Sequence, residues 1–315
     1  MKILITGGLG LLGGRLAHLL LKKGHEVFIG TRKSLKSIPE PLSESVPIQI
    51  DWSNFSTLKS ASKGIDAVVH AAGLNAQSCT SNPSLALDVN GLYTASLLEA
   101  AKDKGVKRFI YLSTIHVYCS PLVGTIDESH PAKNLHPYAT SKLAGEKNIL
   151  YANQMKQIQG VVLRLANGSG YPIFPEIDCW HLLVNNLCRQ AAENRELNLH
   201  SQENQERNFI SINELCLGIE HFLRMPESFI DNVPFNLCSE QSNSIKDIAH
   251  LVASRSKLVL GHRPEIVYKK ANKKIIYGKK LRIDSLKIKK TGLFINNNLD
   301  TEIDNTLMFC ASNFA

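Results

Sequence analysis

Near its start the chain reads Lys2-Ile-Leu-Ile-Thr6-Gly7-Gly-Leu-Gly10-Leu-Leu-Gly13, and this stretch decides the fold. The first five residues are an apolar run of strand length, and residues 16–23 have the apolar period of a helix that ends at Gly24. Glycines between a strand and a helix let the backbone pass close to a pyrophosphate, which the helix N-terminus then binds. The stretch therefore predicts a dinucleotide site, with the glycine spacing G-x-x-G-x-x-G.

The second predicted strand, residues 26–29, indicates which dinucleotide is bound. Such a strand normally ends at an acidic residue that binds the adenosine ribose of NAD. This chain has Gly30-Thr31-Arg32-Lys33 there. An arginine beside a hydroxyl suits a 2′-phosphate, because its hydrogen bonds to the phosphate are charge-assisted. We expect NADP(H) as the preferred cofactor and NAD(H) as the alternative. The other interpretation is that Arg32 and Lys33 are solvated charges of a loop and have no role in binding.

A pair of residues in the stretch 137–146 predicts proton chemistry. Tyr138 and Lys142 are four residues apart, so on a helix their side chains are neighbours on one face. A lysine ammonium beside a phenol favours the phenolate and lowers a pKa that starts at about 10. The pair then provides a proton acceptor near neutral pH, although the same spacing also occurs by chance on exposed helices.

The bulk composition predicts one large core and a smaller lobe. The chain has 315 residues, of which 43% are hydrophobic, and strands alternate with helical patterns through its first half. This predicts an α/β fold with a Rossmann-type, doubly wound parallel sheet and a smaller, discontinuous C-terminal lobe. We expect the dinucleotide-binding domain to comprise residues 1–170 plus 205–240, and the substrate lobe to comprise residues 171–204 plus 241–315.

Cysteine usage, charge and hydropathy favour a cytoplasmic enzyme. The seven cysteines are odd in number, and no pair has metal-ligand or C-x-x-C spacing, so we expect reduced thiols and no metal. No apolar run approaches a membrane span. Residues 262–290 contain eleven Lys/Arg and two acidic residues. Because no aromatic-interleaved nucleic-acid motif accompanies it, this run favours a solvated surface over nucleic acid or a membrane as partner.

Taken together, the motifs resemble a known family. In order along the chain they are Thr6–Gly13, Asp51-Trp52, His70-Ala-Ala-Gly73, Asn90, Tyr111-Leu-Ser-Thr114, Tyr138-x-x-x-Lys142, Leu163-Arg-Leu-Ala-Asn167-Gly-Ser-Gly170, Arg207–Leu215, Phe235–Ser239 and Leu281–Ser285. The chain resembles the extended short-chain dehydrogenase/reductases, and specifically the nucleotide-sugar epimerase/dehydratase family. The resemblance covers essentially the whole chain, and the order of the motifs makes it more specific than any one of them.

The resemblance implies roles for individual residues. Tyr138 would be the catalytic acid/base, Lys142 would hold the nicotinamide ribose, and Thr114, four residues before Tyr118, would be the catalytic hydroxyl. Asp51 would accept a hydrogen bond from the adenine amino group. The cofactor-binding residues implied are Gly7, Gly10, Leu11, Leu12, Gly13, Thr31, Arg32, Asp51, Trp52, Ala71, Ala72, Gly73, Asn90, Ser113, Tyr138 and Lys142.

The resemblance also implies a substrate site made of His116, Asn167, His181 and Arg207, with Arg207 at the nucleotide diphosphate. Dehydratases of the family carry an Asp-Glu pair after the catalytic threonine, whereas this chain has Ile115-His116. Because imidazole titrates near neutral pH, His116 and His181 could exchange protons beside a ketone. The alternative is that the two histidines do not meet.

Two reactions remain after the dehydratase is set aside. The first choice is an NADPH-dependent reductase of a nucleotide-activated 4-keto-(deoxy)hexose in surface-polysaccharide synthesis, because net reduction draws on NADPH. The alternative is a UDP-hexose 4-epimerase of the UDP-glucose type. A third hypothesis, a non-catalytic NADP-binding protein, is disfavoured because the threonine, tyrosine and lysine are all present. The implied partner is a nucleotide-diphosphate sugar, and the implied assembly is a homodimer.

Overall fold

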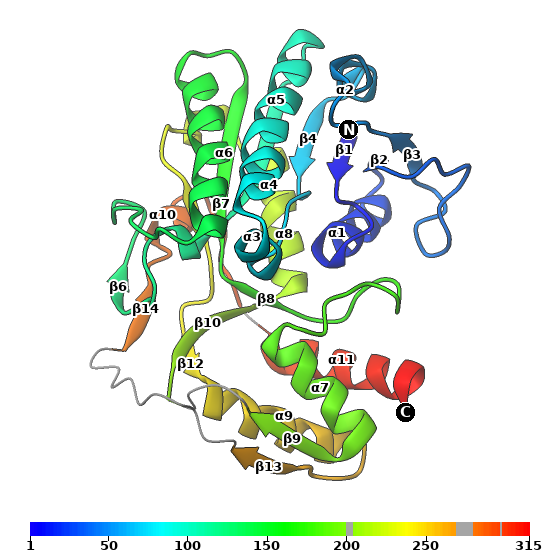
Figure 1. Ribbon diagram of the computed structural model, residues 1–315, viewed down its shortest axis with the longest axis vertical. Coiled ribbons are helices and arrows are strands. Elements are labelled where there is room, and N and C mark those ends of the chain that lie inside the picture. Colours follow the sequence, from blue (N-terminus) through cyan, green and yellow to red (C-terminus); the bar gives the residue numbers. More distant parts are fainter. Residues whose placement is uncertain (200–203, 269–279, 297) are drawn as a thin grey trace.

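Seven parallel strands form the central sheet in the computed structural model, which describes residues 1–199, 204–268, 280–296 and 298–315. The strand order is β11-β7-β5-β4-β1-β2-β3, which places β1 inside the sheet, between β4 and β2 (Figure 1). The chain crosses from one side of β1 to the other after β3, as in dinucleotide-binding folds. The strands are β1 (Lys2–Thr6), β2 (Glu26–Thr31), β3 (Val46–Gln49), β4 (Ala67–His70), β5 (Arg108–Thr114), β7 (Gln159–Leu165) and β11 (Phe235–Leu237).

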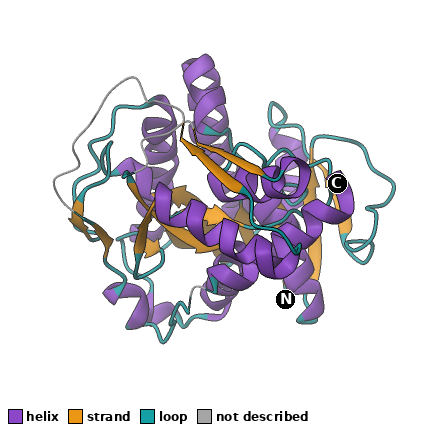
Figure 2. Cartoon of the chain, turned by 90° about the horizontal axis from the view of Figure 1, so that it is seen from below, coloured by secondary structure: helices purple, strands orange, loops and turns teal. Residues whose placement is uncertain are grey.

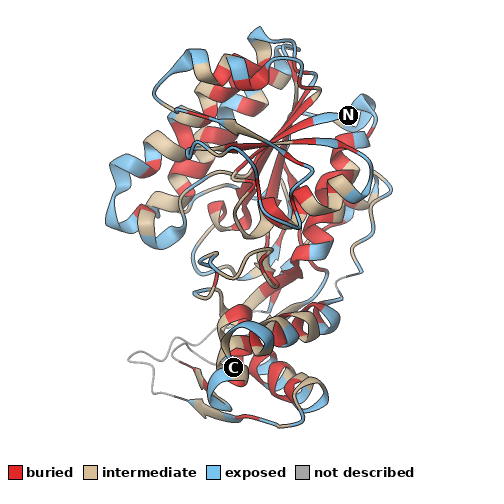
Figure 3. Cartoon of the chain, turned by 90° about the vertical axis from the view of Figure 1, so that its right-hand side faces the viewer, coloured by how far each residue is buried: buried red, intermediate tan, exposed pale blue. Residues whose placement is uncertain are grey.

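Helices cover both faces of this sheet, and the alternating side chains of β1 show which helices lie on each face. Ile3 and Ile5 pack with α1 (Leu11–Lys22) and α8 (Ile212–Arg224), whereas Leu4 packs on the opposite face. That opposite face carries α2 (Phe55–Ser62), α5 (Tyr93–Asp103) and α6 (Pro137–Gln154). Buried residues accordingly concentrate on the strands and on the inner sides of the helices (Figure 3). The predicted doubly wound fold is confirmed.

Short helices connect β4 to α5 beside the carboxyl ends of the strands. They are α3 (Ala76–Ser81), α4 (Pro83–Leu87) and the single π-turn η1 (Asp88–Leu92), and a 3₁₀ turn η2 (Ile115–Val117) follows β5. Asn75 and Asn82 cap α3 and α4, since each side chain accepts a hydrogen bond from a backbone N–H three residues on. The π-turn contains Asn90, and such turns often occur at functional sites.

A smaller lobe lies below the sheet in Figure 1, and Figure 2 shows the molecule from that side. Its core is formed by α7 (Leu183–Asn194), α9 (Ile245–Val259) and α11 (Leu299–Phe314), with the parallel pair β9 (Glu196–Leu199) and β13 (Glu265–Tyr268). Between lobe and sheet lie three short strands, β8 (Asn167–Ser169), β10 (Glu206–Ser211) and β12 (Ser242–Ser244). A 3₁₀ turn, η3 (Glu227–Phe229), precedes β11.

Residues 281–295 depart from the predicted domain boundary. We expected them in the lobe, but β14 (Leu281–Ile283) pairs with β6 (Gly124–Ile126), and Ile288 of α10 (Leu286–Lys289) belongs to the core of the large sheet. The reason is that their buried apolar side chains have a partner surface beside β11 and not among the lobe helices. Part of the basic run of residues 262–290, namely residues 269–279, lies outside the described residues.

The described residues also bear on the expected thiols and membrane segments. All seven cysteines are free, and all except the partly buried Cys119 are buried. In the described ranges, no helix has the length and apolar character to cross a bilayer. No cluster of three or more His, Cys, Asp or Glu side chains suited to a metal ion is found in those ranges either.

Candidate active site

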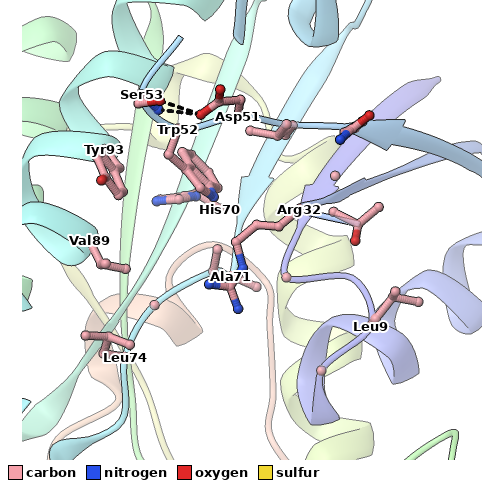
Figure 4. A pocket seen from close by; sticks show the side chains of 18 of the residues that line it. Leu9, Arg32, Asp51, Trp52, Ser53, His70, Ala71, Leu74, Val89 and Tyr93 are labelled. Carbon is pink, nitrogen blue, oxygen red and sulfur yellow. Dashed lines mark hydrogen bonds between the residues drawn. The ribbon is translucent and has the colours of Figure 1, made fainter. Parts of the chain in front are cut away.

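A cavity of about 780 Å³ lies at the carboxyl ends of β1, β2, β3 and β4. This is the place where doubly wound sheets bind ligands, because the strand order reverses there. Figure 4 shows Trp52, Val89 and Tyr93 on one side of the cavity and Leu9 on the other. The lining residues are Gly7, Leu9, Gly10, Gly30, Thr31, Arg32, Gln49, Ile50, Asp51, Trp52, Ser53, His70, Ala71, Ala72, Gly73, Leu74, Leu85, Val89 and Tyr93.

The glycine turn before the N-terminus of α1 has a geometry that fits a dinucleotide. Gly7 has φ +70°, and a β-carbon built there would lie 2.8 Å from the Ala72 nitrogen. A β-carbon on Gly13 would lie 2.1 Å from the Gly7 carbonyl oxygen, so only glycine allows this approach of turn and helix. Gly10 caps α1 without a side-chain hydrogen bond. The first N–H groups of the helix can therefore bind a phosphate.

The far end of the cavity has the features of an adenine site. The rings of Trp52 and Tyr93 are stacked, with centroids 5.8 Å apart and planes 12° apart. The Asp51 carboxylate accepts hydrogen bonds from Ser53 Oγ at 2.6 Å and Ser53 N at 3.0 Å, and these bonds lower its pKa. The predicted Asp51 and Trp52 therefore lie together at a flat apolar surface with an ionised acceptor beside it.

Arg32 is exposed and lines the cavity just beyond β2. Its neighbour Thr31 accepts a hydrogen bond from the Lys33 backbone at 3.1 Å, which fixes a tight turn after the strand. Lys33 itself is not among the lining residues found in the described chain. Asp51 is the one acidic residue among the cavity-lining side chains that the structure describes, and Ser53 holds its carboxylate.

His70 is a buried neutral histidine beneath the cavity. Thr94 Oγ1 donates to the Asn90 carbonyl oxygen at 2.9 Å, so it accepts from His70 Nε2 at 3.0 Å. His70 Nδ1 then accepts from Thr6 Oγ1 at 2.6 Å. Burial, reinforced by the charge of Lys142, lowers the pKa of His70 to about 3. A second proton on this ring would reverse the bond to Thr6, whose hydroxyl would then have to accept.

We expect this histidine to make stability depend on pH. Because its folded pKa lies below the ordinary value of 6.5, the unfolded chain binds the extra proton first, and stability is lost as the pH falls from about 6.5 towards 3. The loss reaches about 1.4 kcal/mol per pH unit. Denaturant unfolding of wild type and His70→Asn from pH 8 to pH 4 measures it. The wild-type curve should fall more steeply below pH 6.5, and parallel curves would contradict the assignment.

Lys142 and Asn90 lie beside Gly73, which lines the cavity. A β-carbon on Gly73 would lie 2.8 Å from Asn90 Oδ1 and 2.9 Å from Lys142 Nζ, so only glycine lets the backbone approach both groups. Asn90 Oδ1 accepts from the Leu74 backbone at 3.0 Å, and its Nδ2 donates to Ser141 Oγ at 3.0 Å. Burial lowers the pKa of Lys142 to about 8, while its Nζ donates to the Leu112 carbonyl oxygen at 3.1 Å.

Tyr138 and Thr114 meet, as predicted, because α6 packs against the end of β5. The Tyr138 hydroxyl hydrogen bonds to Thr114, and Thr114 Oγ1 also accepts from the His116 backbone at 3.1 Å. The predicted fall in the pKa of Tyr138 is wrong. Burial raises that pKa to about 12, and the bond to Thr114 only partly opposes the rise. Lys142 Nζ donates to the Leu112 carbonyl oxygen, and its charge does not contribute to this shift.

His116, Asn167 and Arg207 also come together. Asn167 Nδ2 donates to the Asn208 carbonyl oxygen at 2.8 Å, so its Oδ1 accepts from His116 Nε2 at 3.2 Å. This arrangement leaves His116 Nδ1 as an acceptor. Burial lowers the pKa of His116, the bond to Asn167 raises it, and the nearby charge of Arg207 lowers it. The imidazole is thus a neutral acceptor beside a guanidinium.

His181 does not join this group. It is exposed, and its Nδ1 lies 3.6 Å from the Asp178 carboxylate. None of the contacts found for His181 in the described ranges is with His116. The hypothesis that the two histidines exchange protons is therefore not supported, because His116 is a partly buried ring held by Asn167 and His181 lies on the lobe surface.

Ser113 also departs from its predicted role. Its hydroxyl donates to Glu146 Oε1 at 2.5 Å and is buried. Successive side chains of a strand point to opposite faces. Thr114 therefore reaches the Tyr138 hydroxyl, whereas Ser113 points away from that hydroxyl. The Ser113 side chain belongs to a buried hydrogen-bond network and does not line the cavity. Three residues of this region were not predicted from the sequence, namely Tyr93, Ser53 and Glu146. For Tyr93 the available signal was its helical spacing from Asn90.

Comparisons with known proteins agree with this geometry. A model of the NAD dependent epimerase/dehydratase family matches residues 3–238. A putative UDP-glucose 4-epimerase of Methanocaldococcus jannaschii is 24% identical over 279 residues, which cover 87% of this chain and 88% of that protein. A dTDP-6-deoxy-L-talose 4-dehydrogenase (NAD(P)(+)) of Kitasatospora kifunensis is 32% identical over 179 residues, 54% of each chain.

Among solved structures, the UDP-glucose 4-epimerase of Thermotoga maritima with UDP-glucose is similar over 100% of both chains. Its TM-score is 0.82 and its sequence identity is 19%. An identity this low supports a shared fold and leaves the reaction to be argued from the site.

Proposed function

The chain belongs to the NAD dependent epimerase/dehydratase family, and from this premise we propose that it is an NADPH-dependent reductase of a nucleotide-activated 4-keto-hexose or 4-keto-deoxyhexose. As a member it is an enzyme of the extended short-chain dehydrogenase/reductase type. The substrate class, the direction of the reaction and the preference for NADPH are our proposal.

The observation that carries the proposal is Arg32 in the cavity wall. It lies where an NAD-specific site presents a carboxylate, and a guanidinium there suits a 2′-phosphate. Cells use NADPH for net reduction, whereas an epimerase returns its bound cofactor to the starting state within each turnover. The Kitasatospora relative, named as a 4-dehydrogenase that takes NAD(P)+, supports the same choice.

The protonation state of Tyr138 supports reduction as the direction. The bound dinucleotide supplies the hydride. Tyr138, whose pKa is about 12, holds its proton at neutral pH and can give it to the oxygen of a ketone as that oxygen gains negative charge. Thr114 bonds to the same hydroxyl and orients the sugar oxygen. Lys142 lies beside Gly73, where it can hold the ribose hydroxyls.

The residues around Thr114 give no support to a dehydratase. Elimination of water from the sugar needs an acid and a base next to the ketone. Here Ile115 is fully buried in the core, and His116 is a neutral acceptor held by Asn167. His116 suits a hydrogen bond from a sugar hydroxyl, and Arg207 suits the diphosphate. We therefore propose a nucleotide-diphosphate sugar as the substrate that binds between the sheet and the lobe.

A UDP-hexose 4-epimerase is the second candidate. The relatives of Methanocaldococcus jannaschii and Thermotoga maritima carry that name, and their alignments cover most of this chain. Epimerases need the same threonine, tyrosine and lysine, so these residues do not separate the two reactions.

Substrate assays separate them. We expect stoichiometric loss of NADPH absorbance at 340 nm with a 4-keto nucleotide hexose, and little loss when NADH is supplied at the same concentration. Interconversion of UDP-glucose and UDP-galactose without added cofactor would instead establish the epimerase. Cofactor binding with turnover of neither substrate class would favour a non-catalytic NADP-binding protein.

A further inference from the structure

A buried ion pair lies directly behind the proposed catalytic residues. Glu146 follows Lys142 by four residues and Tyr138 by eight, so the three side chains share one face of α6. Its carboxylate is fully buried and binds Arg164 of β7 through Nη2 at 2.7 Å and Nε at 3.0 Å. This bidentate geometry fixes direction as well as distance.

The same carboxylate reaches the strand that carries Thr114. Ser113, the residue before Thr114, donates its hydroxyl to Glu146 Oε1 at 2.5 Å. Ser113 and Arg164 are register partners on β5 and β7, and Asn236 of β11 is the partner of Arg164 on its other side. Tyr118 completes the group, since its ring lies 4.6 Å from the Arg164 guanidinium and its hydroxyl donates to Asn236. Glu146 is thus tied to a polar row across three neighbouring strands.

The helix α6 lies unusually close to β5 at this point. A β-carbon on Gly145 would lie 2.5 Å from the Tyr111 hydroxyl and 2.7 Å from the Asn90 carbonyl oxygen. Lys142 Nζ also donates to the Leu112 carbonyl oxygen. Small sliding movements of the helix therefore break specific contacts, and Glu146 is the contact that ties the helix to the residue next to Thr114.

We infer that Glu146 is a positioning residue, which holds the helix bearing Tyr138 and Lys142 in register with Thr114 through Ser113 and Arg164. The inference rests on the proposed function, because it assumes that these three residues act on the substrate. A buried ion pair is a poor source of stability, since well-packed apolar residues of similar volume often replace it without loss. Apolar residues, however, cannot make the directional hydrogen bonds that link Glu146 to the strands.

The double variant Glu146→Leu/Arg164→Met separates positioning from stability. It removes both charges together, so no unpaired charge remains buried. We expect a melting temperature close to that of wild type. We also expect kcat to be lower by about 100-fold, the size of effect that a 1 Å misplacement produces, with KM for NADPH changed less than about threefold.

The matched control is Arg108→Met on β5, the strand that carries Ser113. Arg108 is a buried cation that binds Gln159 and the carbonyl oxygens of Phe222 and Leu223, at the amino end of β5. Five residues of strand, roughly 17 Å, separate it from Ser113. Its loss should lower the melting temperature and leave kcat unchanged, which shows what destabilisation alone does.

Three results decide the matter. A double variant with wild-type melting temperature and wild-type kcat would overturn the inference. If the double variant does not fold, Ser113→Ala decides, because it removes one hydrogen bond to Glu146 and leaves the ion pair. We expect kcat about fivefold lower and a modestly lower melting temperature, since the buried carboxylate loses one donor. An unchanged kcat would overturn the inference. A crystal structure of whichever variant folds tests the geometry without activity. If the Tyr138–Thr114 hydrogen bond is intact in that crystal structure, the positioning role is rejected. This test holds even if the wild type turns over none of the sugars and the proposed function fails.

Discussion

Tyr138→Phe is expected to lower kcat for the reduction by about 1,000-fold, because it removes the hydroxyl that gives its proton to the sugar oxygen. The ring that packs against its surroundings remains, and the cavity residues that bind the dinucleotide are untouched. Binding of NADPH, followed by the change in its fluorescence, should therefore stay within about twofold of wild type. Single-turnover absorbance at 340 nm measures the chemical step.

The chain offers a matched control on the same helix. Tyr151 also belongs to α6, but it is 61% exposed, so Tyr151→Phe should change neither kcat nor binding. Thr114→Ser keeps a hydroxyl bonded to Tyr138 and should retain most of the activity, whereas Thr114→Val should not. Substantial turnover by Tyr138→Phe would refute the proposed acid, and loss of NADPH binding would show that the substitution had altered the site as a whole.

The parts of the molecule that were predictable from sequence follow local rules. The glycine turn lies between β1 and α1 because strand and helix periods flank it, and parallel strands bring Gly7, Arg32, Asp51 and Gly73 to one edge of the sheet. The i, i+4 spacing of Tyr138 and Lys142 likewise needs only a helix.

What the sequence could not predict depends on neighbours far along the chain. The pKa of Tyr138 is raised because elements distant in sequence bury its hydroxyl, whereas spacing alone shows only the lysine. The stacking of Tyr93 on Trp52 joins residues 41 positions apart. Residues 281–295 leave the lobe because β14 pairs with β6 and Ile288 packs in the core of the large sheet. His181 was expected at the substrate site from the family resemblance, and a resemblance does not say which way a lobe loop points. The homodimer and the cytoplasmic location stay predictions.

Arg32→Ala is expected to weaken NADPH binding by about 10- to 100-fold and NADH binding by less than about threefold. The difference arises because a guanidinium makes charge-assisted hydrogen bonds to a 2′-phosphate, each contributing about 1.5–3 kcal/mol, and has no such partner on NADH. Arg32 is exposed, so solvent screening places the effect towards the lower end of this range, and raising the salt concentration should shrink it.

Lys33→Ala is the matched control, because Lys33 is equally basic and exposed and directly follows Arg32, but it is not among the described residues that line the cavity. Its effect on NADPH should be small and should come only from long-range charge. Fluorescence titrations of both nucleotides against wild type and the two variants give four ratios to compare. If Arg32→Ala weakens both nucleotides equally, the arginine binds a feature that they share, such as the pyrophosphate. The preference for NADPH, and with it the argument for net reduction over epimerisation, would then lose its physical basis.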